Sequence, residues 1–127
     1  MRKLVESRLA LWRELIAEAE AYVAALETKL NITAAAVAGS VARREHQAAS
    51  DIDVVIISDE LPASPLDRIE LLWSVDITRV EPKGYTRAEF LDRLRRRDPL
   101  ICEAVNRGIP LRDPEGFLAG LRTSSPR

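Results

Sequence analysis

The segment 51–58 constrains the fold more than any other part of the chain, because it is an almost unbroken apolar run. It reads Asp-Ile-Asp-Val-Val-Ile-Ile-Ser, and its β-branched residues favour a strand. Apolar side chains at successive positions point to both faces of a strand, so both faces must be covered. The segment therefore predicts a central strand of a sheet that has other parts of the chain packed on each side.

The N-terminal segment 3–30 is expected to form a long helix. Its apolar residues recur at alternating steps of four and three, a spacing that also suits a coiled-coil seam. Leu4, Leu11 and Leu15 widen the apolar stripe beyond a narrow seam. The wider stripe favours a helix that packs on the core of its own domain.

Helices and strands alternate along the rest of the chain. Ser64 before Pro65 suits a helix start, and Thr86 with Glu89 has the spacing of a capping box. The alternation predicts the α/β (α+β) class, a small mixed β-sheet flanked by helices. We expect one domain over 1–122 and a flexible tail over 123–127. The expected elements are strands over 32–38, 51–58, 75–81 and 109–112, and helices over 41–47, 65–73, 86–97, 98–107 and 114–121.

The bulk composition excludes several function classes. The chain has 127 residues and a net charge of −1, so no global positive field attracts nucleic acid. Cys102 is the only cysteine, which excludes an intrachain disulfide and suits a reducing, cytoplasmic compartment. The apolar runs are too short to span a bilayer, and the start lacks the apolar stretch of a signal peptide.

Asp51 and Asp53 are the first candidate site residues. A strand repeats every two residues, so both carboxylates project from the same face at the start of the central strand. Two uncompensated carboxylates repel each other and are costly to desolvate. Magnesium prefers oxygen ligands and is commonly held by one or two carboxylates plus substrate phosphates. The pair therefore fits a Mg²⁺ site, although two solvated acids at a strand end would have the same sequence.

Gly39 and Ser40 form the second candidate feature, between an apolar strand and a short helix. Glycine lets the backbone approach a phosphate closely, and the serine hydroxyl can add a hydrogen-bond donor. Taken alone, the pair fits an ordinary turn with a serine helix cap equally well.

Together the two features form one pattern: a Gly-Ser pair, ten residues, and an Asp-Ile-Asp triplet before an apolar strand. This pattern resembles the signature of the minimal nucleotidyltransferase family, antitoxin type, within the polymerase-beta-like nucleotidyltransferase superfamily. The segment 80–86 is similar to a subgroup of these proteins. The family usually has glycine where this chain has Arg44.

The resemblance implies a nucleotidyltransferase fold and a set of residue roles. Gly39 and Ser40 would hold the triphosphate, and Asp51 and Asp53 would be catalytic metal ligands. Arg43 matches a position that is often arginine in the family, and its guanidinium suits phosphate geometry. The implied cofactors are Mg²⁺ and ATP, with ATP as substrate.

A third carboxylate is expected, because nucleotidyl transfer with two metal ions usually needs another acid from a neighbouring strand. That acid could also accept or orient the proton of the attacking hydroxyl. Glu81 and Asp76 compete for this role at opposite ends of the expected strand 75–81. Being five residues apart, they would point to opposite faces of a regular strand. The subgroup similarity favours Glu81 as the third catalytic and metal-binding residue.

The resemblance implies a magnesium-dependent transfer of AMP, or another nucleoside monophosphate, from a triphosphate to a hydroxyl. Small proteins of this kind often pair with a small helical partner protein in a toxin–antitoxin module, and adenylylate that partner as its antitoxin. The alternative is a catalytically silent binding module that neutralises such a partner by contact. The near-zero net charge argues against a nucleic-acid acceptor, and a homo-oligomer is compatible with the sequence.

Overall fold

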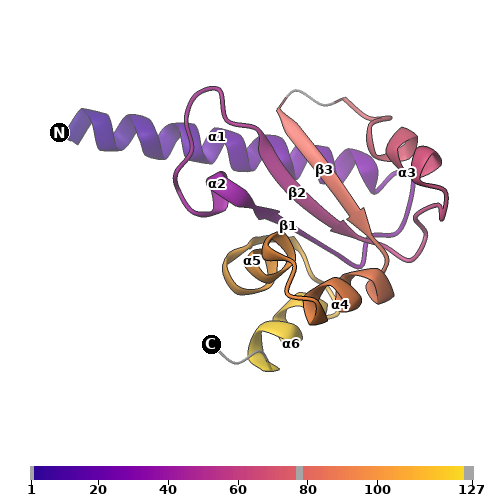
Figure 1. Ribbon diagram of the computed structural model, residues 1–127. Helices are drawn as coiled ribbons and strands as arrows, with labels where there is room; N and C mark the ends of the chain where they lie inside the picture. The colour runs from indigo at the N-terminus through magenta and orange to yellow at the C-terminus, as the bar shows by residue number, and fades with distance from the viewer. Residues whose placement is uncertain (1, 77–78, 125–127) are drawn as a thin grey trace.

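The structure is a computed structural model that describes residues 2–76 and 79–124. It has a mixed four-stranded sheet with helices on both faces (Figure 1), which confirms the predicted fold class. The elements in chain order are α1 (Arg2–Leu26), β1 (Ala34–Ala38), α2 (Gly39–Ala42), β2 (Ile52–Ile57), α3 (Pro65–Leu72), β3 (Val80–Tyr85), α4 (Arg87–Arg95), α5 (Pro99–Arg107), β4 (Ile109–Arg112) and α6 (Phe117–Ser124).

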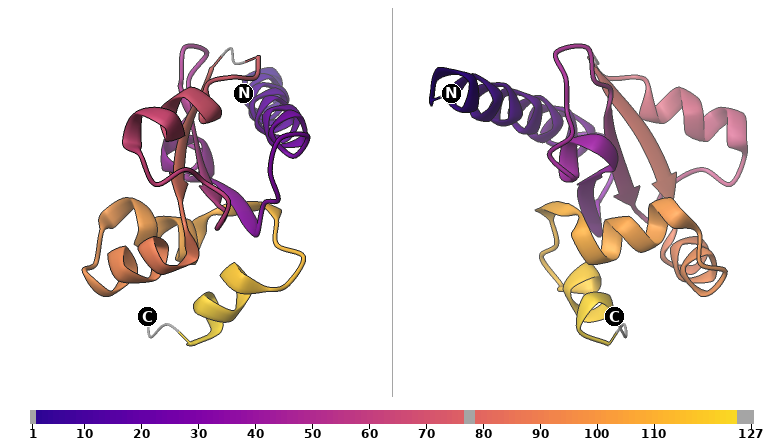
Figure 2. Two further views of the ribbon diagram at one scale, coloured as in Figure 1. Left: turned by 90° about the vertical axis from the view of Figure 1, so that its right-hand side faces the viewer. Right: turned by 60° about the vertical axis from the view of Figure 1, so that its left-hand side comes forward.

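The sheet has the strand order β3-β2-β1-β4, so the apolar segment 51–58 does supply a central strand. β2 runs parallel to β3 and antiparallel to β1, and β4 pairs antiparallel with β1 at the other edge. Figure 2 shows α1 on one side of the sheet and α4 and α5 on the other. Ile52, Val54 and Ile56 pack in the core on the α1 side, whereas Val55 and Ile57 pack in the core on the α5 side.

Helix α1 is only partly a core helix. Its buried residues lie in the second half, from Leu15 to Leu26, and this half packs against the sheet as the wide stripe predicted. The first half projects beyond the sheet (Figure 1), where Leu4 and Val5 are 65% and 63% exposed. The helix ends at Leu26, before the predicted end at residue 30, because residues 27–29 form a turn.

The predicted position of the third strand was wrong. β3 begins at Val80 and runs through Pro82 and Gly84, which we expected to end a strand over 75–81. Arg79, directly before β3, accepts a backbone hydrogen bond from Ile52 of β2, and Tyr85, at the end of β3, accepts one from Ser58. The backbone groups of the odd-numbered positions therefore face β2. Pro82 therefore faces the open edge, where a missing N–H costs no ladder bond.

The ends of the other elements largely agree with the sequence signals. The Ser64 side chain caps α3 and the Thr86–Glu89 capping box begins α4. The short helix α2 ends at Ala42, well before residue 47, and α6 begins at Phe117, three residues later than expected. α6 also includes residues 123 and 124 of the predicted tail, and 125–127 lie outside the described residues. Within the part of the chain that the structure describes, no helix is long and apolar enough to cross a membrane.

Candidate active site

The turn from β1 into α2 is fixed by Gly39. Its φ is +68°, a left-handed conformation that favours glycine. A Cβ at this position would clash with Oδ2 of Asp53, so the absence of a side chain lets the turn lie directly against that carboxylate. Ser40 follows in the first turn of α2 and is half-buried. The structure thus brings the predicted phosphate turn into contact with a predicted metal ligand.

Asp53 and Glu81 form the acidic part of the site. They are Cα register partners in the parallel β2–β3 pair, so their side chains lie on the same face, the one covered by α5. Lys83 is two residues further along β3 on this face, and its Nζ lies 3.2 Å from both Asp53 Oδ1 and Glu81 Oε1. One ammonium therefore bridges the two carboxylates.

The charge of Lys83 is secured by these contacts. Burial works to lower its pKa, but the hydrogen bond and attraction of Asp53, followed by those of Glu81, outweigh burial and leave the pKa raised. Sequence reasoning missed Lys83, because a strand placed over 75–81 ends before this residue. Period-two alternation from Glu81 would have found it once β3 was placed correctly.

The other two predicted carboxylates lie apart from this pair. Asp51 is exposed and immediately precedes β2. Asp76 is exposed and precedes β3. The prediction that Asp76 and Glu81 lie on one strand and point to its opposite faces was therefore wrong. Among the described residues, no group of three His, Cys, Asp or Glu side chains is placed to hold a metal ion.

The donor set of the acidic pair nevertheless fits a divalent cation. Asp53 and Glu81 already turn carboxylate oxygens toward one positive charge, that of Lys83. Mg²⁺ takes such oxygen ligands and needs only one or two carboxylates when substrate phosphates complete its coordination. The Asp53–Glu81 pair is thus suited to a metal that arrives with a nucleotide, and Asp51 lies directly before the same strand.

Gly39 and Arg43, two of the residues predicted to bind the triphosphate, both contact Glu103 of α5. The Gly39 N–H donates to Glu103 Oε1 at 2.8 Å, and Arg43 Nη1 donates to Glu103 Oε2 at 2.6 Å. Arg43 Nε also donates to Glu45 at 3.1 Å. These hydrogen bonds, first the one that Glu103 accepts and then the one that Glu45 accepts, raise the pKa of Arg43. Glu103 was missed because it is distant in sequence and reaches the turn only through the packing of α5.

The loop between α2 and β2 is anchored on α1. Arg44, at the position where the resembling family usually has glycine, has a φ of 61°, and its guanidinium stacks 4.1 Å from the ring centroid of Trp12. His46 is buried, with Nε2 3.0 Å from the backbone oxygen of Arg8. The loop thus keeps a left-handed turn without glycine, and the stacking contact helps to offset its strain.

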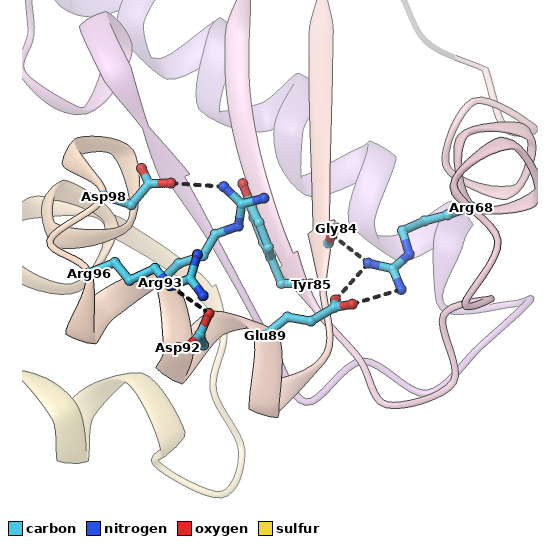
Figure 3. A pocket seen from close by; sticks show the side chains of 8 residues that line it. All are labelled: Arg68, Gly84, Tyr85, Glu89, Asp92, Arg93, Arg96 and Asp98. Atoms are coloured by element: carbon cyan, nitrogen blue, oxygen red, sulfur yellow. Dashed lines mark hydrogen bonds and ion pairs between the residues drawn. The ribbon is translucent and has the colours of Figure 1, made fainter.

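A separate cavity of about 350 Å³ lies beside α4, near the C-terminal end of β3 (Figure 3). Its arginines are paired with acids: Arg68 with Glu89, Arg93 with Asp98, and Arg96 with Asp92. None of Gly39, Asp53 and Glu81 lines it. Its charges are balanced internally, and it is distinct from the candidate active site.

The chain belongs to the family described as Polymerase beta, Nucleotidyltransferase, whose match covers residues 20–113. The matched segment includes the Gly39 turn, Asp51, Asp53 and Glu81. The class of protein that the sequence pattern predicted is therefore confirmed.

Two solved structures share the fold. One is a putative nucleotidyltransferase from Sulfolobus solfataricus, with a TM-score of 0.60 and 20% identity over 68% of this chain and 79% of that chain. The other is a toxin–antitoxin structure with AMP-PNP, with a TM-score of 0.55 and 18% identity over 82% of this chain and 81% of that chain. No curated protein matches the chain.

Proposed function

We propose that this chain is a magnesium-dependent nucleotidyltransferase that moves AMP from ATP to a hydroxyl group. The observation that carries this proposal is the juxtaposition of the Gly39 turn with Asp53 and its register partner Glu81. Membership of the family supports the reaction class. Gly39, Ser40 and Arg43 would bind the triphosphate, and Asp53 and Glu81 would hold the metal together with Asp51.

The reaction requires little covalent chemistry from the protein. The acceptor oxygen forms a bond to the α-phosphorus, the bond from that phosphorus to the bridging oxygen breaks, and pyrophosphate leaves. Bound Mg²⁺ would supply charge neutralisation on the phosphate oxygens. Glu81, the more exposed acid of the pair, would accept the proton of the acceptor hydroxyl. Arg43 would orient the triphosphate through paired N–H donors.

The acceptor is proposed to be a partner protein in a toxin–antitoxin pair. The resemblance to antitoxin-type nucleotidyltransferases motivates this, and one structure with the same fold is a toxin–antitoxin complex with AMP-PNP. The net charge of −1 supports a protein acceptor over a nucleic acid, because nucleic-acid binding draws most of its affinity from phosphate contacts.

A second candidate function is a silent module that neutralises the partner by contact alone. The internal ion pairs of Lys83 with Asp53 and Glu81 favour this alternative, because they satisfy the acids without a metal. In that case the nucleotidyltransferase fold would serve only as a binding surface.

The first test is calorimetric titration of Mg²⁺ with a non-hydrolysable ATP analogue. We expect binding by the wild-type chain and at least about a tenfold loss in Asp53→Asn, because the substitution removes a ligand charge while keeping the shape. Asp76→Asn is the matched control and should bind like the wild type. Equal affinity in all three proteins would exclude the metal assignment.

The second test addresses the acceptor. Radiolabelled ATP is offered to the purified protein with the product of its neighbouring gene, and separately with total RNA. Label on the neighbouring protein is the expected result. Label on RNA alone would overturn the protein acceptor, and label on neither would support the silent binding module.

A further inference from the structure

Lys83 occupies the centre of the acidic pair. Its Nζ is equidistant, at 3.2 Å, from an oxygen of Asp53 and an oxygen of Glu81. These are the two acids that the register of β2 and β3 places side by side. The ammonium at this position offsets one of the two negative charges of the pair whenever no other cation is bound.

We propose that Lys83 is an internal counter-cation that holds the metal position of the resting site and leaves it when a metal–nucleotide complex binds. This inference rests on the proposed function, because it takes Asp53 and Glu81 as the metal-binding acids. Lys83 is a positioning residue in this proposal, acting through the two acids.

The exchange follows from distance and charge. A magnesium ion binds carboxylate oxygens at about 2.0–2.1 Å, so it would use the oxygens that Lys83 now contacts. The ammonium and a divalent ion cannot both remain within a few ångströms of the same oxygens without strong repulsion. One of the two cations must therefore leave these oxygens. The ammonium can do so because it is attached to the backbone by a flexible side chain.

The location of Lys83 allows it to move. It lies on β3, an edge strand of the sheet, and its side chain is 31% exposed. A lysine stem has four rotatable carbons and carries a strongly hydrated charge, so the ammonium can swing into water at small cost. The two ion pairs are partly exposed, which places each in the weak range for such contacts.

The consequence is that metal binding depends on the nucleotide. A free divalent ion must displace the ammonium using only the two acids as ligands. A metal that arrives with a triphosphate brings negative oxygens, which compensate for the displaced charge and can attract the released ammonium. Lys83 therefore suppresses binding of metal alone more than binding of the metal–nucleotide complex.

The test is titration of Mn²⁺, another cation suited to carboxylate ligands, into the nucleotide-free protein. Lys83→Met should bind Mn²⁺ about tenfold more tightly than the wild type, the gain expected from removing two weak competing ion pairs. Lys29→Met is the matched control, since Lys29 contacts Ser74 instead of either acid, and should leave the affinity unchanged. In the double variant Asp53→Asn/Lys83→Met the gain should disappear.

A structural role for Lys83 would give the opposite result. If its ammonium were needed to hold the acids in place, Lys83→Met would bind Mn²⁺ more weakly, and this outcome overturns the proposal. Unchanged affinity would overturn it as well.

NMR of the wild-type lysine side chains provides a second readout if the variant does not fold. The Lys83 Cε resonance should move when Mg²⁺ and an ATP analogue are added, and a stationary resonance in a protein that binds both would contradict displacement.

The two proposals fail in different ways. If the wild type binds Mg²⁺ with the ATP analogue but Lys83→Met binds Mn²⁺ no more tightly than the wild type does, only the proposed displacement of Lys83 is rejected. If the wild type binds neither metal nor nucleotide, the proposed function is wrong and this inference falls with it.

Discussion

The Gly39 turn and the Asp53–Glu81 pair lie against each other but are held in place by different means. The turn is set by the backbone, with a left-handed φ of +68° at a buried glycine. It is tied to α5 through Glu103, whose side chain is only 19% exposed. The acidic pair depends on side-chain contacts between the central strand β2 and the edge strand β3, where Glu81 is 49% exposed.

This difference separates a rigid side of the site from an adaptable side. The turn cannot change without breaking the packing between β1, α2 and β2, so its N–H is positioned before any ligand arrives. The Lys83 bridge can open by rotation of one side chain. Each side nevertheless already contacts a charge of the sign that its ligand would bring: the carboxylate of Glu103 at the turn and the ammonium of Lys83 at the acids.

The largest effect is expected from Gly39→Ala, which alters the rigid side of the site. The new Cβ would clash with the Asp53 carboxylate in addition to adopting a left-handed backbone. We expect a loss of about 3 kcal/mol or more in the free energy of unfolding, from backbone strain and overpacking together. Chemical denaturation measures the loss, and calorimetry should find that ATP-analogue binding has disappeared.

Gly116→Ala is the control for backbone strain alone. Gly116 has a similar φ of +71°, but nothing lies within 4 Å of an added Cβ. This variant should lose only about 1–2 kcal/mol, the cost of a left-handed residue that carries a Cβ. Equal losses of unfolding free energy in the two variants would mean that Asp53 moves aside freely. The Gly39 turn would then be as adaptable as the acidic pair.

The next effect in size concerns the adaptable side. Glu81→Gln should reduce nucleotidyl transfer by at least about 100-fold, the usual minimum for losing a proton acceptor or metal ligand. Asp76→Asn should leave most activity, because Asp76 is exposed and lies outside β3. A single-turnover assay with the protein acceptor provides the comparison. The reverse ranking would assign the third carboxylate to Asp76 and leave Glu81 as a partner of Lys83 only.

The sequence was sufficient for the parts of the site that depend on local pattern. The acids precede an apolar strand, and glycine marks a turn, so β2 and the Gly39 turn could both be predicted. β3 was misplaced because Pro82 usually ends a strand, and only the edge position of β3 explains why it is tolerated. Lys83 was lost with that strand. Glu103 could not be predicted by any periodicity, since it reaches Gly39 from 64 positions along the chain.

The smallest effect is expected from Glu103→Gln. This variant tests whether the Glu103 carboxylate occupies the rigid side of the site in the way that a phosphate would. Glutamine can still accept a hydrogen bond from the Gly39 N–H, so the turn should keep its shape. The loss of charge weakens the hold on Arg43, which then becomes available to phosphate. We expect the ATP analogue to bind about threefold more tightly with Mg²⁺, a change in the range of one partly exposed ion pair.

Glu45→Gln is the matched control for this change, because Glu45 also pairs with Arg43 but its side chain is 65% exposed. It is not among the partners of the Gly39 N–H, which donates to Glu103. Removing its charge should change the affinity less than Glu103→Gln does. Calorimetry on both variants at one salt concentration decides between two roles for Glu103. Tighter binding in Glu103→Gln identifies a carboxylate that competes with phosphate, so both sides of the site would exchange an internal charge for the ligand. Weaker binding identifies a carboxylate that positions Arg43, and exchange would then be confined to the Lys83 side.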